Sequence, residues 1–338
     1  MKFFAILFIS LGLFSCKSSD IPLYDLGTAQ PLETGRTVYQ SNDVGILAEL
    51  RVKDSLLIAI DPIGEKKFII INLFTGKEIQ KFGESGRGPR EFLSPEFLIN
   101  NDIRNADSSH ITLFDSNLSR FSNIDFNRIL TDPDYKIPTQ KFPAKITGNA
   151  NLNITDGKII GKSSSLESLG MFFIYDLKTG QQKWVDFYPN PQNIAIAERN
   201  YAFNMHLAAQ KDRIIGAMTF LDMIQVFDTT GHHIQTYKFS ENIVPAPEMM
   251  LGNSAVYFTD VYATPQYCYF IRLGYPSGEE NNRKNGAYII QTDWNGNVVK
   301  SYKLKQFLYG FCIDESRNKL LGIHSEDQDT FQIIEYNL

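Results

Sequence analysis

The chain of 338 residues has no surplus of basic residues, which narrows the partners that it can bind. Lysine and arginine together number 33, against 38 aspartates and glutamates, and the net charge is −5. Proteins that bind nucleic acid concentrate positive charge on one face. The composition therefore gives no electrostatic basis for a nucleic-acid partner, and we expect none.

The sequence also lacks the spacings that mark common catalytic and metal sites. It contains no Gly-x-Ser-x-Gly elbow, no His-x-x-x-His pair and no calcium loop of the EF-hand type. The glycine-rich string Gly83–Phe92 has no Gly-Lys-Ser/Thr ending, so it is not a nucleotide-binding loop. We therefore expect no cofactor, no metal ion and no catalytic residues. The alternative is a metal-dependent hydrolase or lyase with its site at a central channel, to which Asp102, Asp260 and Asp314 could contribute.

Cysteine is scarce, with three residues in the chain. Cys268 and Cys312 both lie in apolar runs that are typical of strands. An exported protein could pair them, but a buried cysteine acting as a small apolar side chain is more common. We expect both to be buried and unpaired.

The N-terminus carries the features of a bacterial lipoprotein signal. Lys2 precedes an apolar run, Phe3–Leu13, that is too short to span a bilayer, and Leu13-Phe14-Ser15-Cys16 has the form of a lipobox. We expect residues 1–16 to be a lipoprotein signal peptide in which Cys16 takes the acyl chains, palmitate included. Loss of Lys2 changes the net charge from −5 to −6 in the remaining chain. The protein would then be exported and anchored by lipid in the cell envelope. The outer membrane is favoured because Lys17, not aspartate, follows the cysteine.

One local pattern recurs along the chain: an apolar β-rich run, then aspartate or asparagine, then a turn and a second β-rich run. Aspartate or asparagine followed shortly by glycine is strong hairpin chemistry. The 265 residues from the first to the last of these positions make five intervals, a mean period of about 53. The six positions are Asn72, Asp115, Asp176, Asp228, Asp293 and Asn337.

This repeat predicts an all-β fold, a six-bladed β-propeller of four-stranded antiparallel blades over residues 17–338. A pair of β-sandwiches or a seven-bladed ring are the alternatives. The last copy ends on its third strand, so its outermost strand must come from elsewhere in the chain. We expect that strand to be supplied by the N-terminal segment Ile21–Leu26, which would close the ring.

A family resemblance follows from three stretches of the sequence. The string Gly86-Arg87-Gly88-Pro89-Arg90-Glu91-Phe92 resembles the Gly-x-Gly-Pro-x-Glu-Phe segment of the TolB-like six-bladed propeller lipoproteins of Bacteroidetes, although Arg90 stands where that family more often has glycine. Ile21–Tyr24 and Gln30–Thr34 resemble the opening of the same family. The resemblance implies an exported, lipid-anchored propeller; related propellers mainly bind proteins or other partners.

The candidate binding residues lie in loops that a propeller presents on one face. They combine arginine, aromatic and acidic side chains, which are enriched in binding hot spots. For the loop around Arg87 a structural crossover is the favoured interpretation, and ligand contact is the alternative. We expect a non-enzymatic binding or scaffold protein of the envelope, with a protein, peptide or glycan partner and a membrane contact through Cys16. The candidate residues are Arg87, Arg90, Arg199, Tyr201, Asp222 and His324.

Overall fold

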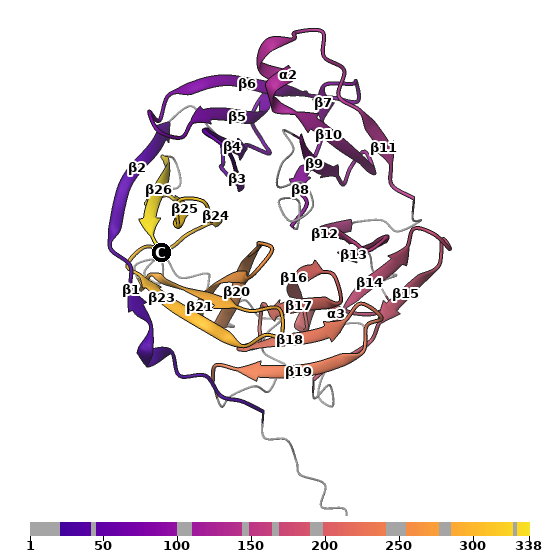
Figure 1. Ribbon diagram of the computed structural model, residues 1–338, viewed down its shortest axis with the longest axis vertical. Helices are drawn as coiled ribbons and strands as arrows, with labels where there is room; N and C mark the ends of the chain where they lie inside the picture. The colour runs from indigo at the N-terminus through magenta and orange to yellow at the C-terminus, as the bar shows by residue number, and fades with distance from the viewer. Residues whose placement is uncertain are drawn as a thin grey trace, which may run out of the picture.

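The computed structural model describes residues 21–41, 45–99, 110–143, 149–163, 169–189, 199–240, 255–276, 285–326 and 330–338. The signal peptide and Cys16 lie outside these residues. Within them, the strands form six sheets arranged as blades around a central axis, and this confirms the six-bladed propeller (Figure 1). The same described residues contain no helix that is long and apolar enough to cross a membrane.

Each blade has four antiparallel strands, counted from the axis outward. The inner strands are β3 (Glu49–Lys53), β8 (Pro95–Phe97), β12 (Asn149–Thr155), β16 (Met205–Gln210), β20 (Ala255–Ala263) and β24 (Gly310–Asp314). The second strands are β4 (Leu56–Ile60), β9 (His110–Asp115), β13 (Lys158–Ser163), β17 (Arg213–Met218), β21 (Cys268–Pro276) and β25 (Lys319–His324). The third strands are β5 (Lys66–Asn72), β10 (Arg120–Asp125), β14 (Phe172–Asp176), β18 (Met223–Asp228), β22 (Ala287–Thr292) and β26 (Phe331–Asn337). The outer strands are β6 (Glu78–Ser85), β11 (Thr139–Lys141), β15 (Gln182–Val185), β19 (His233–Lys238), β23 (Val298–Leu304) and β2 (Thr34–Ser41).

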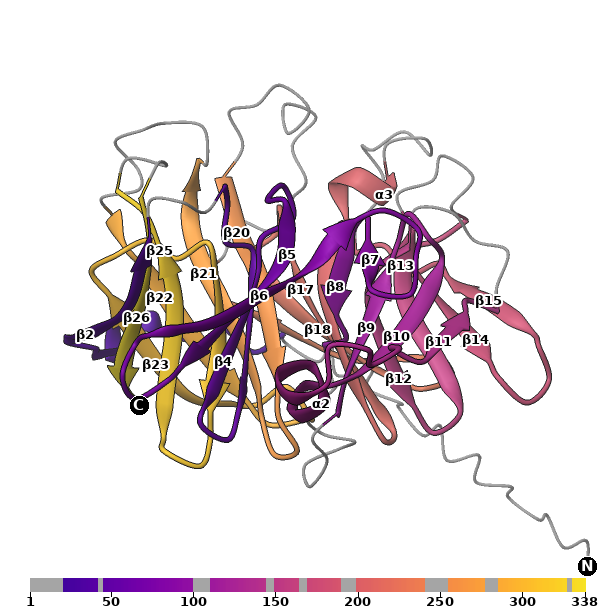
Figure 2. The same cartoon turned by 90° about the horizontal axis from the view of Figure 1, so that it is seen from above.

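A few short elements supplement the blades. Strands β1 (Gln30–Pro31) and β7 (Glu91–Phe92) pair in parallel with β23 and β6. The helices are η1 (Leu26–Thr28), α2 (Phe126–Thr131) and α3 (Arg199–Ala202). We call the face that carries the connections from each outer strand to the next inner strand the loop face. Figure 2 shows α3 on the loop face and α2 on the opposite, turn face.

The turns between third and outer strands follow from the repeated aspartate or asparagine. In blades 1, 3, 4 and 5 the side-chain Oδ1 accepts hydrogen bonds from backbone amides two to four residues later, and a glycine with positive φ completes the turn. These contacts confirm the hairpins that the repeat predicts. The turns are Asn72–Gly76, Asp176–Gly180, Asp228–Gly231 and Asp293–Gly296.

Asp115 does not belong to that series, so its assignment to the repeat was wrong. It ends β9, the second strand of blade 2, and therefore lies on the loop face. Its buried carboxylate accepts hydrogen bonds from the amides of Leu93 at 2.8 Å, Ser94 at 3.2 Å and Leu118 at 3.0 Å. Asp115 therefore fixes the segment that leads into the inner strand of blade 2, and it does not close a hairpin on the turn face.

The ring is closed by an N-terminal strand, as expected, but by a different segment. Strand β2 is the outer strand of blade 6, paired antiparallel with β26, whereas Ile21–Leu26 was predicted. Leu23 instead forms a parallel bridge with Lys238 of blade 4, and β1 then pairs with β23 of blade 5. Residues 21–41 thus form an N-terminal belt along the outside of blades 4, 5 and 6 (Figure 1).

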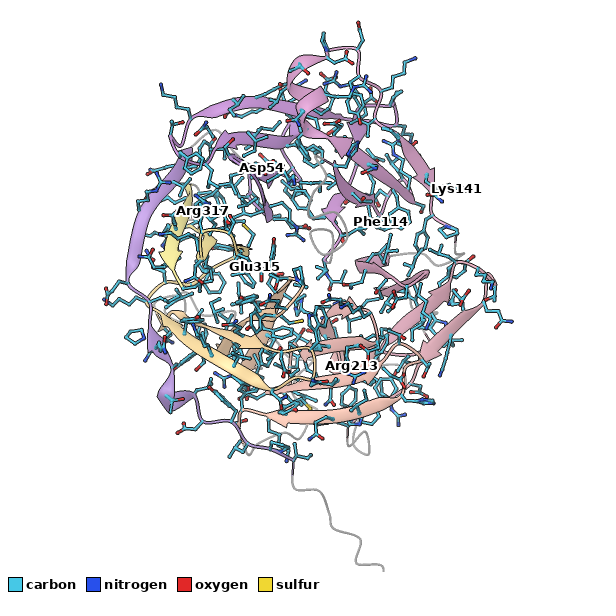
Figure 3. All side chains as sticks on the ribbon, in the orientation of Figure 1. Asp54, Phe114, Lys141, Arg213, Glu315 and Arg317 are labelled. Atoms are coloured by element: carbon cyan, nitrogen blue, oxygen red, sulfur yellow. The ribbon has the colours of Figure 1, made fainter. Side chains whose placement is uncertain are left out.

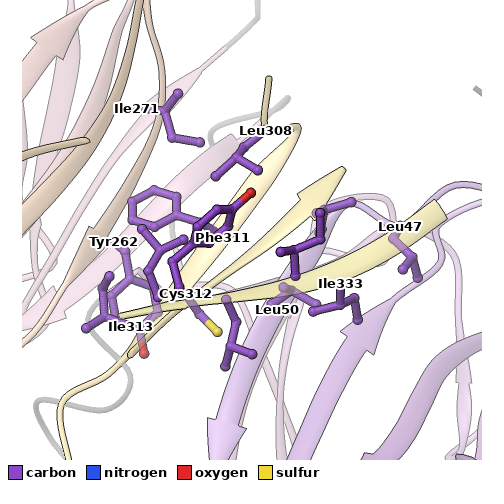
Figure 4. Close-up of a cluster of buried hydrophobic side chains, with 14 of the residues drawn as sticks. Leu47, Leu50, Tyr262, Ile271, Leu308, Phe311, Cys312, Ile313 and Ile333 are labelled. Atoms are coloured by element: carbon purple, nitrogen blue, oxygen red, sulfur yellow. The ribbon is translucent and has the colours of Figure 1, made fainter. Parts of the chain in front are cut away.

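The core lies between adjacent blades, where the apolar faces of the sheets pack together. Its largest cluster joins blades 5, 6 and 1 and includes Leu50, Ile271 and Phe311 (Figure 4). Cys312 is buried in this cluster and Cys268 in another. Neither cysteine is in a disulfide, which confirms the expectation that they do not pair.

Candidate binding site at the central channel

Charged side chains on the inner strands gather around a cavity in the central channel. The cavity has a volume of about 60 Å³, and its polar lining is Glu49, Arg51, Glu96, Asn151 and Asp260. These residues come from four inner strands: β3, β8, β12 and β20. The ring places these four strands around its axis and so brings together groups that are far apart in the sequence (Figure 1).

Alternation along the inner strand explains how β3 places charge in the channel. Successive side chains of a strand point to opposite faces, and Leu50 is completely buried in the core between Glu49 and Arg51. Glu49 starts the strand near the loop face and Arg51 lies two residues deeper. The pattern Glu-Leu-Arg thus anchors the strand with its apolar residue and lines the channel with the charged ones.

Arg51 is held firmly at the deeper side of the cavity. Its guanidinium donates to the carbonyl oxygens of Leu50 at 2.8 Å and Leu98 at 3.1 Å. Its central carbon lies 4.9 Å from the ring centre of Phe97 and 4.9 Å from that of Tyr262. Arginine over aromatic faces is stabilised by a cation–π attraction. Arg51 is therefore a fixed positive charge beneath the carboxylates.

The three carboxylates are held by backbone amides, yet burial disfavours their ionised forms. Glu49 accepts a hydrogen bond from the amide of Phe97 at 2.8 Å, and Asp260 accepts one from Val261 at 2.8 Å. Burial raises the pKa of Asp260 to about 7 and, together with the neighbouring Glu49 charge, that of Glu96 to about 8. Burial also raises the pKa of Glu49, although Arg51 opposes that shift. Asp260 and Glu96 therefore gain and lose protons near neutral pH.

Two basic side chains of blades 3 and 4 lie near enough to act electrostatically on Glu96 or on each other. Lys162 donates a hydrogen bond to Asn204 Oδ1 at 2.8 Å, and burial lowers the pKa of Lys162 to about 8 despite the attraction of Glu96. Burial and the Lys162 charge lower the pKa of His206 to about 3, so this imidazole is neutral at ordinary pH. The channel therefore mixes three acids with Arg51 and Lys162.

The glycine-rich loop of blade 1 is a structural crossover. The Glu91 carboxylate turns back into the loop and accepts a hydrogen bond from the amide of Gly88 at 2.7 Å. A Cβ at Gly86, whose φ is +155°, would lie 2.0 Å from Glu91 Oε2. Arg120 also holds the loop by donating to the carbonyl of Gly88 at 3.2 Å. This geometry supports the favoured interpretation of the segment.

Arg87 and Arg90 lie on this crossover at the rim between blades 1 and 2, away from the channel cavity. Arg87 is exposed, and Arg90 donates to the carbonyl of Pro133. Arg90 also lines a rim cavity of about 490 Å³ together with Lys66, Lys81 and Lys136. Arg87 and Arg90 therefore do not lie beside the other candidate binding residues.

Arg199 and Tyr201 come together on α3 at the loop face, between blades 3 and 4. The Tyr201 side chain is 50% exposed, and its ring centre lies 5.0 Å from that of Phe220. The Arg199 guanidinium lies 5.7 Å from the ring centre of Tyr188. Contact of these residues with a partner stays a prediction.

Asp222 and His324 are buried, so their side chains hold loops in place. Asp222 forms a bidentate ion pair with Arg272, with oxygen–nitrogen distances of 2.7 and 2.6 Å. His324 Nδ1 donates to the carbonyl of Phe307 at 2.9 Å. Of the aspartates considered for a channel metal, Asp260 lies at the cavity, Asp314 pairs with Arg317, and Asp102 lies outside the described residues.

Glu49, Glu96 and Lys162 were missed by the sequence reasoning. The available signal was a charged residue at alternate positions of short apolar strands, as in Glu49-Leu50-Arg51. That signal does not distinguish an inner strand from an outer one, because both have a polar side.

The fold and the cavity define a six-bladed β-propeller with a charged central channel. The model of the TolB-like 6-blade propeller-like family matches residues 28–316, and the chain belongs to that family. Among solved structures, a member of the DUF4221 family from Bacteroides vulgatus is 13% identical, with a TM-score of 0.57, covering 90% of this chain and 98% of that one. A protein from Bacteroides fragilis, described as a predicted exported protein, is also 13% identical, with a TM-score of 0.51 and coverage of 90% and 93%. These two likenesses show the fold. No curated protein matches the chain.

Proposed function

We propose that this chain is an exported envelope lipoprotein that works as a non-enzymatic binding propeller. Its partner is a protein, peptide or glycan, which it holds at the loop face over the channel. Export is supported by the lipobox at Cys16 and by the description of the Bacteroides fragilis neighbour as exported. TolB-like propellers offer such a face through loops on a rigid ring.

The observation that carries this proposal is the charged cavity at the centre of the ring. Four inner strands converge there with three carboxylates, an amide and a guanidinium, although buried charge is costly for a fold that needs only apolar packing. Protein sites with strongly shifted pKa values are candidates for function. The exposed Tyr201–Phe220 pair on the same face supplies an aromatic contact of the type found in binding hot spots.

Affinity capture from native envelopes tests the proposal. We expect the double substitution Glu49→Gln/Asp260→Asn and the separate substitution Tyr201→Ala each to reduce recovery of the partner by about tenfold, the equivalent of losing one good contact. Arg87→Ala/Arg90→Ala tests the rim in parallel.

The matched control is Asp54→Asn/Glu315→Gln, which makes the same chemical changes at two exposed residues that Figure 3 labels. They follow the ends of the inner strands β3 and β24 and so lie on the turn face. Asp54 has a φ of 54°, a conformation that asparagine tolerates well. Recovery that is unaffected by all loop-face and channel substitutions, or equally reduced by the control, would show that this face is not the binding surface.

A further inference from the structure

The channel cavity contains acceptors that lack a matching donor. In the part of the chain that the structure describes, the buried Oδ1 atom of Asn151 accepts no hydrogen bond. Asn151 sits at a bulge of β12 with a φ of 50°, and its backbone amide is directed to Glu96. A buried acceptor without a donor costs free energy, so the cavity is built to receive a group that donates hydrogen bonds.

Charge around the cavity points to a donor that is also a cation. Its lining holds Glu49, Glu96 and Asp260 against a single guanidinium, that of Arg51. Arg51 already donates to two backbone carbonyls and stacks between two rings, so it cannot turn to satisfy the carboxylates fully. Lys162 offsets part of the charge of Glu96. The negative charge that remains is neutralised by protons or by an added cation.

Size limits which cation fits. A volume of about 60 Å³ corresponds to roughly two water molecules, since each occupies about 30 Å³ in the liquid. An ammonium group with its last methylene is of this size and has three donors for several acceptors. Within the described residues, no three acidic, histidine or cysteine side chains stand close enough to share a metal ion. A glycan hydroxyl would satisfy Asn151 but would leave the charge uncompensated.

We infer that the cavity lined by Glu49, Glu96, Asn151 and Asp260 binds a primary ammonium group, the end of a lysine side chain of a protein or peptide partner. This inference rests on the proposed function and names the chemistry of its partner. The lysine enters from the loop face, where the inner strands begin, and its flexible methylene stem passes Phe97 and Phe311.

Binding of the ammonium group depends on pH because it requires the ionised carboxylates. Among the described residues, the titratable groups that line the site are Glu49, Arg51, Glu96 and Asp260. Lys162 on β13 and Asp115 add their charges near Glu96, and His206 on β16 lies near Lys162. With its pKa near 7, Asp260 is mostly protonated at pH 6 and mostly ionised at pH 8. Affinity should therefore rise by about tenfold from pH 6 to pH 8, and binding should release protons. Lys162 loses its charge near pH 8, which strengthens binding in the same direction.

The test uses two synthetic probes, the peptide acetyl-Gly-Gly-Lys-Gly-Gly-amide and the same peptide with an acetylated lysine side chain. Calorimetry in buffers of different ionisation enthalpy measures affinity and released protons at pH 6 and pH 8. We expect the free-lysine peptide to bind and the acetylated peptide not to bind. Asp260→Asn should reduce the pH dependence, and Glu96→Gln/Asp260→Asn should abolish most of it, because Glu96 also ionises in this range. Asp54→Asn should leave affinity and proton release unchanged.

Equal binding of the two peptides, no binding of the free-lysine peptide, or proton release on adding calcium chloride alone would overturn the inference. If the channel substitutions abolish partner capture while the lysine peptide does not bind, the ammonium assignment fails and the binding function stands. If capture is also unaffected, both fail.

Discussion

Asp222 and Arg272 join the loop after β17 to the second strand of the next blade through a buried ion pair. The Asp222 side chain is fully buried and that of Arg272 is 10% exposed. Asp222→Asn would leave the guanidinium buried without its carboxylate, and breaking a buried pair in this way costs about 3–5 kcal/mol. We expect the free energy of unfolding in urea to fall by that amount.

The exposed pair Lys305–Glu33 offers a control for this residue. Its side chains are 74% and 80% exposed, and exposed pairs contribute at most about 1 kcal/mol. Glu33→Gln should therefore have little effect. If Asp222→Asn were no more destabilising than Glu33→Gln, the buried pair would not be holding the two blades together.

The position of Asp222 could be predicted from the sequence, but its ion-pair partner could not. Asp222 was predicted correctly to lie in a loop on the loop face, because the strand pattern on either side is local. Its ion-pair partner is 50 residues away on another blade, and no local pattern indicates that contact. Glu49 and Asp260 meet at the channel cavity for the same reason, through the closure of the ring.

At the scale of elements, the two halves of the N-terminal belt make different numbers of strand contacts with the blades. Residues 21–31 add a single bridge at Leu23 and the two-residue strand β1, whereas β2 supplies the whole outer strand of blade 6. Val38 and Tyr39 of β2 are buried in the core. The two halves should therefore differ in their effect on stability.

A truncation series tests this difference, with a chain that begins at Ile21 as the reference. Starting the chain at Leu32 should cost about 1–3 kcal/mol, because a few backbone bonds and one aromatic contact are lost. Starting it at Gly45 should cost more than about 5 kcal/mol, since the buried side chains of Leu32, Val38 and Tyr39 and the strand pairing of β26 are lost. Thermal and urea unfolding give the values. Similar losses for both truncations would contradict the assignment of β2 as the closing strand.

The sequence predicted correctly the elements that depend on neighbouring residues. It failed for the elements that depend on contacts between blades that are distant in the sequence. The turn at Asp228 was predictable because the aspartate, the glycine and the two strands lie within a few residues. The closing strand was placed at Ile21–Leu26 because that segment begins the chain after the signal peptide. The segment that closes the ring is β2, whose buried residues Val38 and Tyr39 pack in a core that exists only once the blades have assembled. Asp115 was misassigned for the same reason, since aspartate also caps the entry to a blade.

At the scale of the whole molecule, the belt connects the proposed lipid anchor to the rim of the propeller. Four residues separate Cys16 from Ile21, and the five residue steps between them span at most about 18 Å in an extended chain. Ile21 leads directly into the bridge at Lys238 on blade 4. An acyl chain on Cys16 would therefore hold the rim of blade 4 close to the membrane surface, with the channel axis free to present the loop face to a partner.

The anchor itself gives the last prediction. Expressed in a bacterial host, the mature protein should begin at Cys16, carry the mass of several acyl chains, and fractionate with the membrane, since each buried methylene adds about 0.8 kcal/mol of membrane affinity. Mass spectrometry of the mature N-terminus and membrane fractionation measure these properties. Cys16→Ser should release a protein of unchanged thermal stability into the soluble fraction, because the contacts of the belt with blade 4 are made by Pro22, Leu23 and Tyr24. A mature chain that starts at another residue, or that stays in the membrane fraction after Cys16→Ser, would exclude lipidation at Cys16 as the means of attachment.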